Sequence, residues 1–495
     1  MLINLFKLRG DIKLMKKIQD TYFIDSSVAL ETANQNNKFY VNGIVETTQI
    51  CYYDGPKIEN APYNCINVPF DNITSYFSCT KHRIPNIVDP KNGNFTTKEE
   101  FNLFIKILNK EITTAVEKKE KQIIKINNKI KKLEPDFNDK VLRVYVYGCR
   151  TSIVMKSVAE NIANSFKNIG CNVLFDTQLN DLESCDSLNQ KKNVLKFNPH
   201  IIFNINHIYN EYLNDNVFNF IWFQDLMPIL ENNEKITLRQ RDVVFSLISV
   251  FDSYLENKGI EYKRQSFCFN KKSFKILNEV KREKKIVFIG SSYYKTIERF
   301  NIPDSFLNHL KKLFLKGILF DDDLLNRIST KYSFNEQSKK ILKEKVIPFI
   351  IRDSSVRLLC SLDTKYDIEI YGFGWDIYDD VKKYFKGNLS YGEELVKVYN
   401  SSTYAFCPHS EYLLQQRVFE AAACGAIPVL YDIRKLKPEG NYDESFEYFK
   451  DEKSLKRILI KNPKKKDFFR LLSENRYELF INKMINIVKN DIEIY

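Results

Sequence analysis

The stretch Thr403–Leu430, TYAFCPHSEYLLQQRVFEAAACGAIPVL, decides the fold that this sequence predicts. It opens with Thr403–Cys407, a short apolar run that favours a strand, and Pro408 ends that run. The apolar residues that follow take helical spacing as far as Gly425, after which Ile427–Leu430 returns as a buried strand. The stretch therefore predicts a βαβ unit of a parallel sheet.

The loop between the first strand and the helix is the candidate ligand-binding segment of this unit. In open α/β sheets the carboxyl end of a strand is the edge that binds ligands, and a helix that begins there directs its positive end to the same place. Such an arrangement suits phosphate. The residues that we expect at the site are His409 and Glu411 in this loop and Arg417 and Glu420 on the helix that follows it.

Two more loops of small residues follow strands that the sequence predicts at 285–289 and 367–371. Small residues let a backbone approach a phosphate or a sugar closely. Together with the loop at 408–414, they would meet at one edge of the sheet and form a nucleotide-sized pocket. The candidate binding residues in the two loops are Gly290, Ser291, Ser292, Gly372, Gly374 and Trp375.

The first half of the chain also has the pattern of a doubly wound α/β sheet, which begins after Pro135. We expect strands at 141–147, 172–175, 201–205, 218–223, 243–250 and 266–269, with a helix at 157–169. The loops after the third and fourth of these strands hold His207 and Asp225. Each is either a catalytic or acceptor-binding side chain or a structural residue whose hydrogen bonds the fold itself satisfies.

The composition is that of an ordinary globular protein, with 495 residues, 44% of them hydrophobic and 28% charged. No apolar run approaches the roughly 20 residues that span a bilayer, and we expect no secretory signal. Ten cysteines without metal-like spacing favour reduced thiols. We therefore expect a cytoplasmic protein without a metal site.

The net charge of +12 has one concentrated source in residues 104–133, where nine lysines accompany three glutamates. Apolar residues recur there at three-, four- and seven-residue spacing, which predicts an amphipathic helix with its lysines in solvent. A membrane or nucleic-acid contact is the alternative. Met1–Ile18 also mixes apolar residues with lysines, and it is either a packed terminal helix or a segment on a membrane surface.

We expect four regions along the chain. Residues 1–100 form a small accessory α+β region, and residues 101–139 contain the basic amphipathic helix and a linker. Residues 140–280 and 281–495 each form a Rossmann-like α/β domain, with a charged linker at 278–285 between them. A long helix at 468–489 ends the second domain.

The run from Arg417 to Ala426, RVFEAAACGA, resembles the R-x-x-E-x-x-A-C-G signature of group 1 GT-B glycosyltransferases, in particular their spore-maturation (CgeB-like) relatives. Supporting similarities are Phe288–Tyr293, Tyr371–Trp375 and Trp222–Asp225. The resemblance covers residues 140–490. It implies two Rossmann-like domains that face each other across a cleft, with the donor in the second and the acceptor in the first.

The resemblance also implies roles for single residues. Glu420 takes the position of the glutamate that holds the ribose hydroxyls of the nucleotide, and a carboxylate can accept both hydrogen bonds of a vicinal diol. Glu411 is the nearest candidate for a second glutamate that contacts the donor sugar, although it lies nine residues upstream instead of eight. Lys295 and Arg299 are the candidates for binding the diphosphate.

The function that follows is glycosyl transfer from a nucleotide-sugar donor to a glycan, a protein or another acceptor in glycan biosynthesis, with neither a metal nor a further cofactor. We expect no nucleic-acid partner, and a peripheral membrane contact stays open. Two alternatives remain: a glycosyltransferase-like binding protein without turnover, and a nucleotide-sugar epimerase of the GT-B fold. The signature itself has a structural alternative, since Arg417 and Glu420 lie three residues apart and would form an ion pair on a helix surface.

Overall fold

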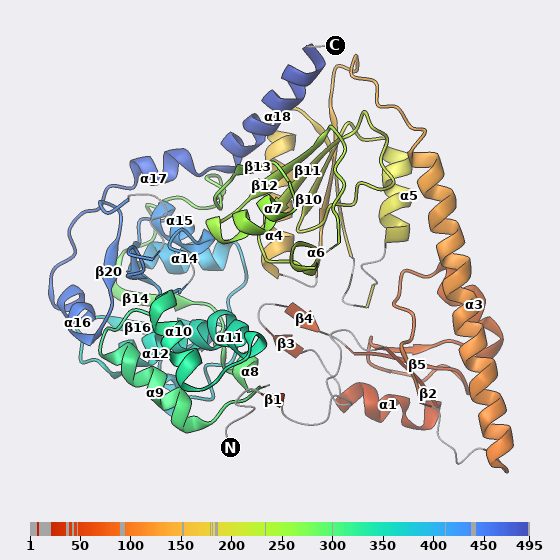
Figure 1. Cartoon of the computed structure of the whole chain (residues 1–495), viewed down its shortest axis with the longest axis horizontal. Coiled ribbons are helices and arrows are strands. Elements are labelled where there is room, and N and C mark those ends of the chain that lie inside the picture. Colours follow the sequence, from red (N-terminus) through yellow and green to blue (C-terminus); the bar gives the residue numbers. More distant parts are fainter. Residues whose placement is uncertain are drawn as a thin grey trace. The chain divides into compact units, whose positions relative to one another are not determined.

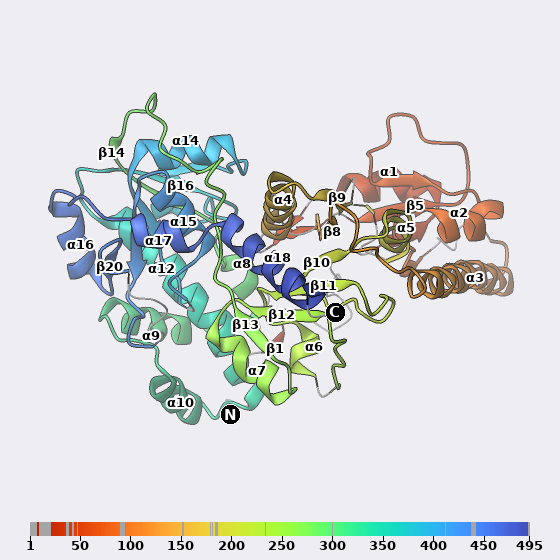
Figure 2. The same ribbon diagram turned by 90° about the horizontal axis from the view of Figure 1, so that it is seen from above.

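The structure, a computed structural model of the whole chain, describes residues 7–8, 21–35, 39–41, 44–46, 48–89, 95–150, 153–178, 180, 182–183, 187–232, 234–298, 300–410, 412–436 and 442–493. The chain divides into two compact units. The C-terminal unit comprises Ser266–Asn482 with Met1–Leu14, and the N-terminal unit comprises Met15–Gln265 with Lys483–Tyr495. Figure 1 and Figure 2 show their elements from two directions.

The C-terminal unit is built on a six-stranded sheet in which all neighbouring strands are parallel. The strand order is β17-β16-β14-β18-β19-β20, which reads 3-2-1-4-5-6 along the chain and is the order of a Rossmann fold. The strands are β14 (Glu283–Ile289), β16 (Asp367–Tyr371), β17 (Phe385–Gly387), β18 (Ser402–Cys407), β19 (Ile427–Tyr431) and β20 (Glu447–Phe449). A two-stranded antiparallel pair, β1 (Lys7–Leu8) with β15 (Phe300–Asn301), lies outside this sheet.

Helices alternate with these strands, as a parallel sheet requires. They are α8 (Tyr294–Ile297), α9 (Asp304–Leu315), α10 (Asp322–Lys331), α11 (Glu336–Ile341), α12 (Ile347–Ser361), α13 (Asp379–Lys382), α14 (Glu393–Ser401), α15 (Gln416–Ala423), α16 (Glu452–Ile460) and α17 (Phe469–Glu474). Helix α18 (Tyr477–Glu493) begins in this unit, and its residues from Lys483 onward belong to the N-terminal unit. A π-helical turn, Leu342–Val346, joins α11 to α12. The predicted βαβ unit is therefore present as β18, α15 and β19.

Helix α15 ends where the sequence predicted, at Gly425. The φ angle of Gly425 is +82°, its amide donates to the carbonyl of Ala422 at 2.9 Å, and the amide of Ala426 donates to the carbonyl of Ala421 at 2.9 Å. These two bonds form a Schellman motif, which favours glycine at the left-handed position. The Arg282 guanidinium adds a hydrogen bond of 2.6 Å to the carbonyl of Cys424, so the negative end of the helix is capped by a cation.

The N-terminal unit contains a second six-stranded parallel sheet, with the strand order β13-β12-β11-β10-β8-β9. Along the chain this reads 6-5-4-3-1-2, the other common order of doubly wound folds. Its strands are β8 (Arg143–Gly148), β9 (Asn172–Thr177), β10 (Ile201–Ile205), β11 (Phe218–Phe223), β12 (Asp242–Ser246) and β13 (Tyr262–Arg264). Its helices are α4 (Ile153–Asn168), α5 (Ser187–Phe197), α6 (Pro228–Glu231) and α7 (Asp252–Asn257), with a 3-10 turn at Ser249–Phe251. The expected pair of Rossmann-like sheets is confirmed.

A smaller sheet precedes the second one in the same unit. It has the order β6-β5-β2-β7 and is parallel throughout, so this part is an α/β layer and not the α+β region that the sequence suggested. Its short later strands lie in a turn-rich segment, which hid them from pattern analysis. The elements are β2 (Thr21–Ile24), α1 (Ser26–Gln35), the hairpin β3 (Phe39–Val41) and β4 (Ile44–Glu46), β5 (Gln49–Tyr52), β6 (Cys65–Asn67), a 3-10 turn (Phe70–Asn72), α2 (Ile73–Cys79) and β7 (Ile87–Val88).

The predicted basic amphipathic helix is α3 (Lys98–Ile130), the long orange helix of Figure 1. The side chain of Thr97 caps it by accepting a hydrogen bond from the amide of Glu100. Its apolar face, which includes Leu108 and Ile112, packs against α2 and α5 and so joins the small sheet to the larger one. Most of its lysines lie in solvent, as expected, but Lys119 is only 5% exposed.

Two predicted elements were wrong. Residues 266–269 form no strand, since the sheet ends with β13. The long helix at 468–489 is broken into α17 and α18 at Asn475, whose side-chain amide donates to the carbonyl of Leu471 at 2.8 Å. The backbone carbonyl of Asn475 accepts from the amide of Phe269 at 3.1 Å, a bond that continuous helix would not allow. Within the described ranges, no helix is both long and apolar enough to cross a bilayer.

Candidate functional site

The strand order of the C-terminal unit reverses between β14 and β18, and the crevice at such a switch point is where doubly wound sheets bind ligands. The loops at 290–292, 372–375 and 408–414 follow β14, β16 and β18, which are neighbours in the sheet. All three loops therefore leave the same edge.

The first two loops are bound directly to each other. The amide of Gly290 donates to the carbonyl of Tyr371 at 2.9 Å, and the amide of Ser292 donates to the carbonyl of Phe373 at 2.9 Å. In the other direction, Nε1 of Trp375 donates to the carbonyl of Gly290 at 2.7 Å. These bonds hold the two loops together as one surface, residues 290–292 and 372–375, which we call the glycine-rich floor.

Glycine is required in this floor for two physical reasons. Gly372 has φ +120°, and a Cβ there would fall well inside the van der Waals radius of the Gly290 carbonyl oxygen. A Cβ on Gly290 would lie 2.6 Å from Nη1 of Arg417. Gly374, with φ +79°, faces the Ser292 side chain at an ordinary contact distance. The loops therefore pack closely because Gly290 and Gly372 have no side chains.

Arg417, in the first turn of α15, connects the third loop segment to the same floor. Its Nη1 donates to the carbonyl of Ile289, the last residue of β14, at 2.8 Å. No ion pair joins Arg417 to Glu420 among the residues that the structure describes, and Glu420 is only 3% exposed. The pair is therefore not a salt bridge on a helix surface.

Two further residues, Arg352 and Asp353, were missed by the sequence analysis. They lie on α12, in the largely apolar run IPFIIRDSSVRLLC, and both are buried. Asp353 accepts hydrogen bonds from the Ser292 hydroxyl at 2.5 Å, the Tyr293 amide at 3.0 Å and the Tyr378 hydroxyl at 2.8 Å. Burial raises its pKa, and these three donors oppose that effect. An adjacent pair of charges in an apolar helix was the signal that could have found them.

Arg352 is a buried cation at the glycine-rich floor, with a side chain that is 4% exposed. Its guanidinium lies 3.8 Å from the centre of the Tyr293 ring, and its Nη1 donates to the carbonyl of Ser291 at 3.4 Å. Its Nε has no hydrogen-bond partner among the described residues. Burial lowers the pKa of Arg352, and the neighbouring charge of Arg417 lowers it further. Arg417 is thus one of the charges that act on Arg352, and a buried cation without an ion pair among the described residues favours an anion beside it.

Glu420 lies one helical turn after Arg417, and its carboxylate is held on one oxygen. Oε1 accepts from the Tyr391 hydroxyl at 2.7 Å and from Nε2 of Gln416 at 2.8 Å. Burial raises the pKa of Glu420 to about 7. The side-chain oxygen of Gln416 has no partner within the described part of the chain. The carboxylate and this amide are the polar groups that α15 supplies beside Arg417.

The other residues that we predicted at the donor site differ in exposure and in their contacts. His409 is half-buried, with its ring centre 4.7 Å from that of Tyr412. Trp375 is fully buried against Phe288 and supports the floor. Lys295 is exposed and forms a 2.9 Å ion pair with Glu298, within its own helix. Arg299 and Glu411 lie outside the described residues.

The predicted pair in the N-terminal unit, His207 and Asp225, follows the adjacent strands β10 and β11. Asn206 joins them: its Oδ1 accepts from the amides of Gln224 at 2.7 Å and Asp225 at 3.1 Å, and its Nδ2 donates to Oδ2 of Asp225 at 2.8 Å. The strand order of this sheet reverses between β8 and β10, and His207 follows β10 at that switch point. Asp225 is exposed at the end of the next strand, β11.

The loop that carries His207 has an unusual backbone. Asn206 and Tyr209 have φ angles of +63° and +46°, a conformation that non-glycine residues rarely adopt and that often marks functional loops. The His207 ring stacks on Tyr209 with 4.8 Å between ring centres, and burial lowers the His207 pKa. A hollow of about 450 Å³ opens here, lined among others by His207, Tyr209, Glu211 and Glu234. A larger open cavity of about 640 Å³ lies elsewhere, beside α16, and none of the predicted residues lines it.

Residues 352–479 match the family model described as glycosyl transferase-like. No curated protein sequence matches the chain. Sucrose-phosphate synthase from Thermosynechococcus elongatus is similar in structure at 11% identity and a TM-score of 0.45, over 72% of this chain and 100% of that one. The Anabaena protein HepE in complex with UDP-glucose is similar at 9% identity and a TM-score of 0.40, over 72% and 100%. The C-terminal unit thus contains a glycosyl transferase-like domain, and the match to its model begins at Arg352 and includes Arg417 and Glu420.

Proposed function

We propose that the chain is a glycosyltransferase that takes its sugar from a nucleoside diphosphate donor bound at the β14/β18 switch point. The observation that carries this proposal is the pair of guanidinium groups, the buried Arg352 and the half-buried Arg417, beside a glycine-rich turn and one helical turn from Glu420. Guanidinium groups bind phosphate oxygens in a fork, and a carboxylate accepts from both hydroxyls of a ribose. The distribution of charge therefore matches a diphosphate joined to a ribose.

In this proposal the two arginines stabilise the negative charge that grows on the diphosphate leaving group. The loop amides contribute less than the sequence led us to expect. The amides of Gly290 and Ser292 already donate to backbone carbonyls, which leaves Ser291 as the one amide of this turn for the donor. The positive charge that other enzymes obtain from a metal is supplied by side chains here, so we propose a reaction that needs neither a metal nor a further cofactor.

The ribose would replace protein groups that already donate hydrogen bonds to Glu420. In this proposal its hydroxyls replace the Tyr391 hydroxyl and the Gln416 amide at Oε1 of Glu420, the oxygen that accepts both of their bonds. The unpartnered oxygen of Gln416 supplies one more acceptor beside it. Binding of the nucleotide therefore requires the segment of Tyr391 to adjust.

For the acceptor we propose the hollow of the N-terminal unit beside His207. Stacked rings with carboxylates at the rim suit the apolar face and the hydroxyls of a sugar ring, so a glycan or a glycosylated protein fits better than a nucleic acid. Burial keeps His207 neutral at physiological pH, and a neutral imidazole can take the proton of an attacking hydroxyl. Asp225 and Asn206 hold the adjacent loop.

A panel of nucleotide sugars tests the proposal, with thermal shift for binding and released nucleotide for turnover. We expect one nucleoside diphosphate sugar to raise the melting temperature and to release its nucleotide once an acceptor is present. Binding without release under any acceptor would favour the binding protein, and conversion of the bound sugar without release would favour the epimerase. No binding by any member of the panel would contradict the proposed donor site.

A further inference from the structure

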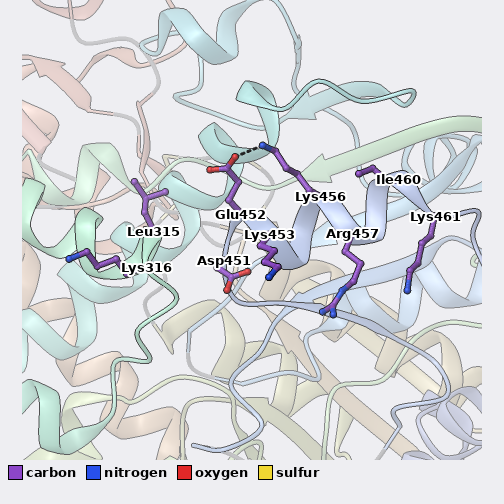
Figure 3. A pocket seen from close by; sticks show the side chains of 9 residues that line it. All are labelled: Leu315, Lys316, Asp451, Glu452, Lys453, Lys456, Arg457, Ile460 and Lys461. Carbon is purple, nitrogen blue, oxygen red and sulfur yellow. Dashed lines mark ion pairs between the residues drawn. The ribbon is translucent and has the colours of Figure 1, made fainter.

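A second surface of the C-terminal unit has a composition that catalysis does not explain. We call it the α16 face, and it consists of Leu315, Lys316, Lys453, Lys456, Arg457, Ile460 and Lys461 around the open cavity of about 640 Å³. Figure 3 shows these side chains on α16 and at the end of α9. Asp451 and Glu452 complete the lining, so five cations accompany two acids.

Local structure fixes how the two helices meet. Helix α9 ends at Gly317, which has φ +68° and whose absent Cβ leaves room for the Asp451 side chain. Asp451 is the N-cap of α16 and accepts from the amide of Ser454 at 2.7 Å. The other side of α16 holds it to the unit through Leu455 and Leu459, which are buried. The α16 face is therefore a rigid surface.

Both acids of this face are already engaged within α16. Asp451 caps the helix, and Glu452 forms an ion pair of 2.5 Å with Lys456, which Figure 3 marks by a dashed line. In the described part of the chain, none of the remaining cations forms an ion pair. Those cations are Lys316, Lys453, Arg457 and Lys461. The lining of the face therefore has a net charge of +3, from five cations and two acids.

Apolar side chains lie among these cations. Ile460 is 74% exposed and Leu315 is 50% exposed, although both belong to residue types that are usually buried. Solvated lysines alone would need no such neighbours. A polar residue in place of Leu315 on α9 or of Ile460 on α16 would make the protein more soluble. Exposed isoleucine and leucine together with several cations form the pattern of a surface that enters the headgroup layer of a membrane.

We propose that the α16 face docks the protein on the surface of an anionic lipid bilayer. The cations attract anionic headgroups, and the two apolar side chains enter the boundary of the acyl region. A nucleic acid offers the same negative charge but no apolar phase that would cover Ile460 and Leu315. The inference is independent of the proposed donor site, because none of the residues of the face lies at the glycine-rich floor.

Co-sedimentation of the full chain with vesicles tests the proposal. We compare phosphatidylcholine vesicles with and without about one third phosphatidylserine at ~0.15 M salt, where exposed charges are screened beyond about 8 Å. The chain should partition onto the anionic vesicles alone. Lys453→Gln combined with Arg457→Gln should weaken that partition about 25-fold, since each cation near an anionic surface contributes about 5-fold. Ile460→Ser should weaken it as well, without any change of charge.

The matched control removes two solvated cations from α3, Lys121→Gln with Lys125→Gln, and should leave the partition unchanged. The melting temperature and nucleotide binding report whether each variant is folded. Equal partition of the α16 variant and the wild type would overturn the proposal, and so would equal partition onto neutral vesicles. Duplex DNA or RNA that binds through Lys453 and Arg457 while vesicles do not bind would assign the face to nucleic acid instead.

Discussion

Arg417 donates a hydrogen bond of 2.8 Å through Nη1 to the carbonyl oxygen of Ile289, across the point where the strand order of the C-terminal sheet reverses. The bond joins the start of α15 to the end of β14. A guanidinium has five N–H donors in a fixed fork, and this contact uses one of them, so the side chain is oriented before a ligand arrives.

The first prediction separates Arg352 from Arg417. Arg352→Met should weaken the binding of a nucleoside diphosphate by about 10- to 100-fold and leave the free nucleoside almost unaffected, because the lost contact is to phosphate. The free energy of unfolding should not fall, since the variant removes a buried charge that forms no ion pair with a carboxylate of the described residues. Titration calorimetry and chemical denaturation measure the two effects. Lys295→Gln is the control, because that exposed lysine is paired with Glu298.

The second prediction concerns Glu420. Glu420→Gln keeps the shape of the side chain but turns one acceptor into a donor, so the nucleotide and the free nucleoside should both bind more weakly, by about 1.5 to 3 kcal/mol. Tyr391→Phe serves as the comparison, because it removes one hydrogen bond to Oε1 and should not weaken nucleotide binding. Wild-type donor affinity in a folded Glu420→Gln variant would remove the nucleotide from this helix.

The third prediction is a pH dependence of stability. The pKa of Glu420 is raised from 4.5 to about 7 by burial, so the folded state holds its proton more tightly than the unfolded state. Stability from this group is therefore present below about pH 4.5 and is lost as the pH rises through 7, by about 3 kcal/mol in total. Glu420→Gln should flatten that part of the stability curve. Identical slopes in the two proteins between pH 5 and about 7.5 would contradict the raised pKa.

The fourth prediction compares two glycines of the same unit. Gly372 and Gly387 both have positive φ angles, +120° and +92°, but a Cβ at Gly387 meets nothing within 4 Å whereas one at Gly372 meets the Gly290 carbonyl. Both alanine variants incur the cost of a left-handed backbone, about 1 to 2 kcal/mol. Only Gly372→Ala should cost more than that and also weaken nucleotide binding. Similar losses in the two variants would mean that the two loops are not in close contact.

The fifth prediction concerns the N-terminal unit. His207→Gln should lower turnover and leave the affinity for the nucleotide almost intact, because the proposed donor residues belong to the other unit. Asp225→Asn should also lower turnover, but less than His207→Gln does, if Asp225 acts by holding the Asn206 loop. Steady-state kinetics with a nucleotide titration distinguish these outcomes. Parallel loss of turnover and nucleotide affinity would make His207 a structural residue.

The sequence predicted those parts of the fold and the candidate site that local patterns encode. Apolar runs and glycines identified the strands that precede Gly290 and Gly372 and the helix that contains Arg417. Arg352 could not be placed in the same way, because its contact with Ser291 joins residues far apart in the chain and only the packing of α12 on the sheet brings them together. Tyr391 was missed for the same reason, since no local pattern pairs it with Glu420.

The diphosphate-binding role of Lys295 stays a prediction, since its side chain is exposed and forms an ion pair with Glu298. At Asn475 the helical pattern continued without interruption, and the break arises from a tertiary bond to Phe269 that no spacing rule contains.

Arg282 neutralises one end of the dipole of helix α15 and leaves the other end unchanged. Its guanidinium bonds to the carbonyls of Cys424 and Ser402 at the far end of the helix, while the first turn contains no acidic residue. The partial negative charge of the helix is thus neutralised and the partial positive charge at Gln416 is retained. The crevice consequently stays attractive to anions even where no side chain reaches, and a substitution at Arg282 would alter the ligand affinity from the opposite end of the helix.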